Sequence, residues 1–84
     1  MELISEFHGL IQSSHGTLTE YERSEVIEFV EAREFNLAVE ALCGFLQVED
    51  RRVPADLYFR IRSLVERLDG VDPYILESVK VSAD

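Results

Sequence analysis

Apolar residues recur at helical spacing along almost the whole chain. In the first segment, five of them fall on one stripe when successive residues are turned by about 100°, namely Leu3, Ile4, Phe7, Leu10 and Ile11. This pattern predicts a helix over about residues 2–14. No segment alternates apolar and polar residues long enough to indicate a strand. The sequence therefore predicts an all-α fold, a compact single-domain bundle of four to five short helices spanning residues 1–84.

The second and third helices are predicted from their caps. Thr19 and Glu22 have the spacing of a capping box, so a helix should begin there and continue to about Arg33. Asn36 suits the N-cap of the next helix, over about 37–48, with Phe35 before it as a hydrophobic staple. Apolar residues cover most of that helix, which indicates a central position contacted by several others.

The last two helices are predicted from proline and glycine positions. Pro54 suits the first turn of a helix that Gly70 would terminate. Asp72 and Pro73 repeat the pattern and predict a short helix over about 73–80. Phe59 falls outside the inward stripe of the longer helix, and we expect the short helix to cover it.

The chain has 84 residues and a formal net charge of −9, which argues against nucleic-acid binding because affinity for phosphates depends on Lys and Arg. A basic protein is the partner that this charge favours. The chain has one cysteine, and no apolar stretch reaches the roughly 18–20 residues that cross a bilayer. Its first residues include acids where a secretory signal would be basic. These features predict a cytoplasmic protein without membrane contact.

Patterns that would indicate catalysis or a cofactor are missing from the sequence. His8 and His15 lie seven residues apart and away from Cys43, and the glycines are scattered, so we expect no metal, no nucleotide and no other cofactor. His8 is expected to be a partly exposed boundary residue and Cys43 a small core residue. We also expect the arginines after residue 50 to form surface pairs, partly with Asp56 and Glu66. The sequence predicts that the protein is not an enzyme.

Negative charge is concentrated in the first half, where residues 1–42 hold nine acids and two arginines. Within the predicted second helix, one aromatic residue projects among acids, which is the composition of an interface hot spot. The predicted partner-binding residues are Glu20, Tyr21, Glu25, Glu28 and Glu31. Two alternatives stay open: an ordinary solvated helix face, or a Tyr21 folded back against the first helix.

Residues 20–70 carry a resemblance to a known family. It consists of the run EVIEFVEAREFNLAVEAL over residues 25–42, an acidic connection, and then Leu57-Tyr58-x-x-Ile61-x-x-Leu64. This pattern resembles the small immunity proteins of bacterial polymorphic-toxin and contact-dependent inhibition systems, in particular the MafI-like family. Members often carry Gly near the corner between the second and third helices, where this chain has Arg33 and Asn36.

The resemblance implies a cytosolic antidote that forms a one-to-one complex with the C-terminal toxin domain of a cognate effector, commonly a nuclease. Such a protein covers the active site or the substrate path, and it needs no catalytic step. The family supplies no contact residues that transfer to this chain. The alternative hypothesis is an acidic helical adaptor or regulatory module that binds another basic intracellular protein.

Overall fold

The computed structural model describes residues 3–48 and 51–81. Within them, four α-helices are followed by one short 3-10 helix, and a two-residue parallel strand pair links the middle of the chain to its end. The elements are α1 (Leu3–Gln12), α2 (Glu20–Glu31), α3 (Phe35–Gln47), β1 (Arg52–Val53), α4 (Ala55–Arg67), η2 (Pro73–Leu76) and β2 (Lys80–Val81). The predicted all-α class and helix count are confirmed, whereas the strands were not predicted. The predicted start at residue 2 and the acidic connection at 49–50 lie outside the described residues.

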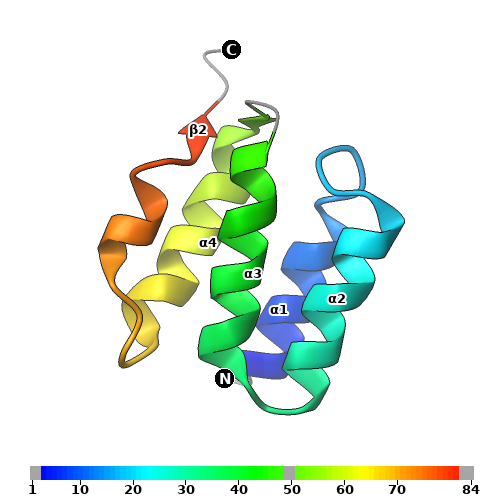
Figure 1. Ribbon diagram of the computed structural model, residues 1–84, viewed down its shortest axis with the longest axis vertical. Coiled ribbons are helices and arrows are strands. Elements are labelled where there is room, and N and C mark those ends of the chain that lie inside the picture. The colour runs from blue at the N-terminus through cyan, green and yellow to red at the C-terminus, as the bar shows by residue number, and fades with distance from the viewer. Residues whose placement is uncertain (1–2, 49–50, 82–84) are drawn as a thin grey trace.

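The helix α3 lies in the middle of the molecule, as its wide apolar arc predicted. It contacts α2, α4 and η2, while α1 packs against both α2 and α4. Figure 1 shows α2 at one edge of the bundle, η2 at the opposite edge and α1 behind the other helices. The outer side of α2 is therefore left uncovered by every described element.

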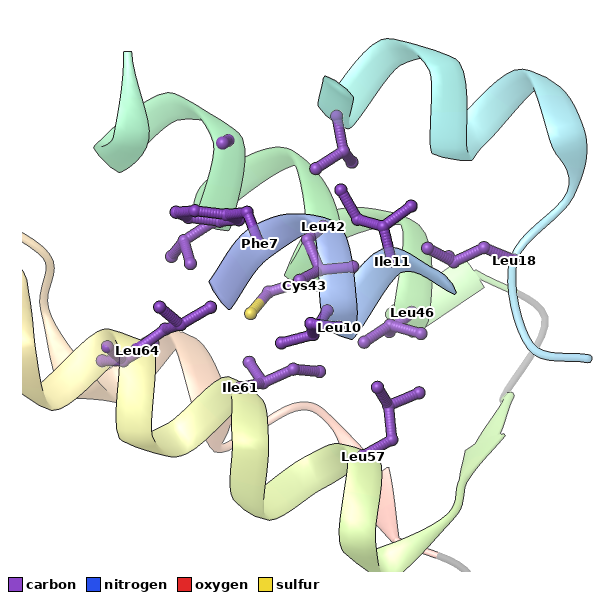
Figure 2. Packing of buried hydrophobic residues seen from close by; sticks show 14 of the residues in the cluster. Phe7, Leu10, Ile11, Leu18, Leu42, Cys43, Leu46, Leu57, Ile61 and Leu64 are labelled. Atoms are coloured by element: carbon purple, nitrogen blue, oxygen red, sulfur yellow. The ribbon is translucent and has the colours of Figure 1, made fainter. Parts of the chain in front are cut away.

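The core is built mainly from α1, α3 and α4. Figure 2 shows Phe7 and Leu10 of α1 among the apolar residues of α3 and α4, whereas Ile11 lies on the side of α2 and Leu18. The ring of Phe7 also stacks on Phe35 at a centroid distance of 5.7 Å. Burying one such side chain contributes about 1.5–3 kcal/mol, so these contacts fix α1 against the rest of the bundle.

Helix α1 ends at Gln12, two residues earlier than predicted. The hydroxyls of Ser13 and Ser14 donate hydrogen bonds to the carbonyls of Gly9 and Ile11, at 3.0 and 2.5 Å. Side chains that bond to the backbone in this way compete with continuation of a helix. The capping box of α2 is confirmed: Thr19 Oγ1 accepts from the Glu22 backbone N–H at 3.1 Å, and Glu22 Oε1 accepts from the Thr19 N–H at 2.9 Å.

The corner between α2 and α3 differs from the prediction. Arg33 has φ 63°, and the N–H groups of Arg33 and Glu34 donate to the carbonyls of Val30 and Phe29. These two bonds make a Schellman motif, which normally places glycine where Arg33 stands. The predicted N-cap at Asn36 is wrong, because Glu34 occupies that position and Asn36 Nδ2 instead donates to the Asp69 carbonyl at 2.8 Å.

The predicted helix over 73–80 is also wrong. Asp72 caps a single 3-10 turn by accepting from the Tyr74 N–H at 3.0 Å, and the turn ends at Leu76. The chain then extends, and Lys80 and Val81 pair in parallel with Arg52 and Val53. Val79 and Val81 are β-branched residues that favour this extended conformation. The strand pair therefore holds residues 80–81 against the segment that precedes α4.

Candidate functional site: the acidic outer face of α2

The predicted partner-binding residues all lie on α2, on the side turned away from α1 and α3. Glu20, Tyr21, Glu28 and Glu31 are exposed, and Glu25 is half-buried. The Tyr21 side chain is 69% exposed, so the alternative in which it folds back against α1 is wrong. We call the five residues Glu20, Tyr21, Glu25, Glu28 and Glu31 the acidic face.

The carboxylates of the acidic face are not used inside the molecule. Among the described residues, none of Glu20, Glu25, Glu28 and Glu31 forms an ion pair or a side-chain hydrogen bond. Glu28 and Glu31 also stand in the last turns of α2, where the helix dipole disfavours negative charge by about 0.3–1 kcal/mol per group. These two acids therefore do not stabilise the helix that carries them.

Glu22 is the acid of α2 that points inward. Its oxygens accept two hydrogen bonds from Arg51, at 2.5 Å to Nη1 and 2.9 Å to Nη2, and the two side chains are only 11% and 17% exposed. Hydrogen bonding to the Arg51 guanidinium lowers the pKa of the Glu22 carboxyl below its ordinary value of 4.5. The expectation that Arg51 forms a surface pair is wrong, since this bridge ties the start of α2 to the segment before β1.

Two arginines of α4, Arg60 and Arg67, contact other elements, and a third, Arg62, pairs within the helix. Arg60 Nη1 donates to Ser13 Oγ at 2.6 Å, and Arg67 forms an ion pair with Glu6 of α1. The predicted surface pair is confirmed for Arg62 and Glu66, whose atoms lie 3.1 Å apart. For Arg60, the contacts that the structure gives are with the end of α1 rather than with Asp56.

Phe59 is 58% exposed, so the prediction that the last helix covers it is wrong. The buried side of α4 runs through Leu57, Ile61 and Leu64, and η2 contributes only one turn beside it. Phe59 stands on the other side of α4, where its ring meets Tyr58 edge-on at 5.7 Å. The described residues thus include three exposed aromatic residues, Tyr21 on α2, Phe59 on α4 and Tyr74 on η2.

Two pockets flank α1, and sequence reasoning found neither. The first has a volume of about 280 Å³ and is lined by His8, Ile11, Gln12, His15, Arg23 and Ile27. The second, of about 230 Å³, is lined by Glu6, Leu10, Phe59, Arg60, Ser63 and Leu64. His8 lies on α1 and His15 in the turn that follows, so their helical spacing in the sequence could not have placed them together.

The described residues contain no cluster of three metal-ligating side chains, and no helix among them is long and apolar enough to cross a membrane. Cys43 is fully buried in α3, and this burial raises the pKa of its thiol to about 12. The thiol is therefore protonated at neutral pH and is a weak nucleophile.

No protein-family model matches the chain, and neither the curated proteins nor the solved structures provide a match.

Proposed function

We propose that this protein is an immunity protein that binds and neutralises a cognate toxin domain, a nuclease, in the cytoplasm. The observation that carries the proposal is the acidic face, in which exposed Tyr21 is surrounded by carboxylates that no described side chain neutralises. The complex is one-to-one, and the protein inhibits by covering the active site or the substrate path. It performs no reaction and uses no cofactor.

Electrostatic complementarity supports this choice of partner. A nuclease presents cations to the phosphates of its substrate, and an acidic helix can bind the same cations. Tyrosine supplies a large, rigid contact area at the centre of such an interface, as hot-spot residues do. The resemblance of residues 20–70 to MafI-like immunity proteins supports the toxin domain as the partner class.

The position of the acids along α2 gives further support. Glu28 and Glu31 oppose the helix dipole and form no ion pair among the described residues, so folding does not explain them. A cationic partner would offset the unfavourable interactions of both groups. A partner that binds Glu28 and Glu31 therefore also relieves their unfavourable interaction with the helix dipole.

The proposal is tested by calorimetric titration of the protein into a catalytically inactive form of the C-terminal toxin domain encoded immediately upstream. We expect a one-to-one complex of nanomolar or tighter affinity. Raising the salt concentration should weaken it mainly by slowing association, because salt screens the steering charges. Absence of binding at low and at high salt would overturn this pairing and favour the acidic adaptor.

A further inference from the structure

The pocket beside α2 differs in chemistry from the acidic face next to it. It lies between α1, the turn that follows, and α2, with Ile11 and Ile27 as apolar walls. Its polar lining consists of Gln12, His8, His15 and Arg23, so both histidines of the chain are in one place. No carboxylate lines it. In a chain of net charge −9, this pocket is a local concentration of nitrogen donors.

The Arg23 guanidinium is held in a fixed position. Its Nη1 donates to the Leu18 carbonyl at 2.8 Å, and the side chain is half-buried between α1 and α2. An arginine carries five N–H donors in a planar fork, so this bond leaves donors for a ligand. A guanidinium oriented beforehand binds a carboxylate with less loss of side-chain entropy than a mobile one.

The size and the walls of the pocket restrict what it accepts. Pockets for drug-sized ligands have volumes of roughly 300–1,000 Å³. A volume of about 280 Å³ therefore suits a small group with one polar end. Ile11 is 3% exposed and Ile27 is partly buried, so the apolar end of a ligand would contact a fixed wall.

We propose that this pocket binds a carboxylate attached to a small apolar body. Arg23 donates to the carboxylate, the imidazole N–H groups of His8 and His15 contribute from the rim, and Ile11 and Ile27 contact the apolar part. The carboxylate belongs either to a free small acid or to a side chain of a docked protein. The site does not rest on the proposed toxin partner, because its lining residues are separate from the acidic face.

The test is an NMR titration of the whole protein with benzoate at constant neutral pH and low salt, following the ring signals of His8 and His15. Benzamide, which has nearly the same shape without the charge, is the control ligand. We expect saturable shifts with benzoate and none with benzamide. Shifts of equal size with both ligands, or shifts that never saturate, would overturn the proposal.

Variants separate the pocket from a general charge effect. Arg23→Gln should weaken benzoate binding at least roughly tenfold, because it removes the charged fork. Arg62→Gln removes the same charge on the exposed side of α4 and should leave binding unchanged. Equal weakening by both variants would contradict the proposal. If Arg23→Gln disturbs the fold, His8→Ala tests the same site from an exposed position and should weaken binding measurably.

A second ligand identifies the source of the carboxylate. N-acetylglutamate N-methylamide imitates an acidic side chain of a protein, whereas benzoate imitates a free aromatic acid. Tighter binding of the glutamate compound assigns the pocket to a docked protein, and tighter binding of benzoate assigns it to a small acid. If neither compound binds, the proposed carboxylate site is wrong. The titration with the toxin domain still tests the proposed function independently.

Discussion

The helices α2 and α4 are alike in length, with 12 and 13 residues, but they use their charges differently. Each carries an exposed aromatic residue, Tyr21 on α2 and Phe59 on α4. The arginines of α4 reach back to α1 or to a glutamate of the same helix. The glutamates of the acidic face point away from the molecule. The arginines of α4 are therefore paired with groups of the fold, whereas the carboxylates of the acidic face form no ion pair among the described residues and are available to a partner.

Glu22 shows that position along α2, rather than residue type, makes this difference. It has the same side chain as Glu25 and Glu28, but it lies on the inward side and binds both Arg51 and the Thr19 backbone. One glutamate of α2 therefore stabilises the fold while its neighbours are available for binding. The predictions below separate these two roles.

The largest expected effect is loss of the inward bridge. Arg51→Met leaves the Glu22 carboxylate nearly buried without its cation, and we expect it to lower the free energy of unfolding by about 3 kcal/mol. Arg62→Met breaks the exposed pair on α4 and should cost about 0.5 kcal/mol or less. Urea denaturation measures both. Similar losses in the two variants would show that the bridge has no special role.

The exposed aromatic residues of α2 and α4, Tyr21 and Phe59, should differ in their contribution to binding. Tyr21→Ala is expected to weaken binding of the toxin domain by roughly 30-fold, because truncating a central hot-spot residue costs about 2 kcal/mol. Phe59→Ala removes another exposed ring, this time from α4, and should leave the affinity unchanged. Titration calorimetry compares the two. A larger loss from Phe59→Ala would move the interface from α2 to α4.

The corners after α2 and α4 provide a third comparison. Gly70 has φ 88°, and a Cβ there would lie 3.0 Å from Asn36 Nδ2, so Gly70→Ala should destabilise the fold by about 1–2 kcal/mol. Arg33 has φ 63° without being glycine, and Arg33→Gly should stabilise by about 1 kcal/mol. Thermal unfolding measures both shifts. Destabilisation by Arg33→Gly would mean that the Arg33 side chain contributes more than its backbone strain costs.

The smallest effect is a pH dependence that Glu22 adds to stability. The pKa of its carboxyl is lower in the folded than in the unfolded chain, so its contribution is present above pH 4.5 and is lost as the pH falls through the folded value. The stability difference between the wild type and Glu22→Gln should therefore shrink below pH 4.5. Urea denaturation at several pH values measures it, and a gap that widens with acid would contradict the assigned bridge.

Local signals in the sequence predicted the parts of the fold that depend on neighbouring residues. The capping box of Thr19 and Glu22 fixed the start of α2, and the wide apolar arc of α3 predicted its central place. The helical period of 3.6 residues placed Tyr21 and Glu28 on one side of α2. It left open whether the Tyr21 ring is exposed or folded back against α1.

Features that join distant segments could not be predicted in the same way. The bridge from Glu22 to Arg51 and the bond from Asn36 to Asp69 span 29 and 33 residues, and no local pattern marks their partners. The strand pair of β1 and β2 is only two residues long, which is too short for alternation to reveal. The pocket around Arg23 likewise forms only when α1 and α2 pack together.

The most direct test of the acidic face compares two double variants that change the net charge equally. Glu28→Lys with Glu31→Lys reverses two exposed acids of α2, and Glu40→Lys with Glu77→Lys reverses two exposed acids on α3 and after η2. Calorimetric titration into the inactive toxin domain should show at least roughly 100-fold weaker binding for the α2 variant and less than about threefold for the other. Equal weakening by both, or unchanged binding of the α2 variant, would contradict the account.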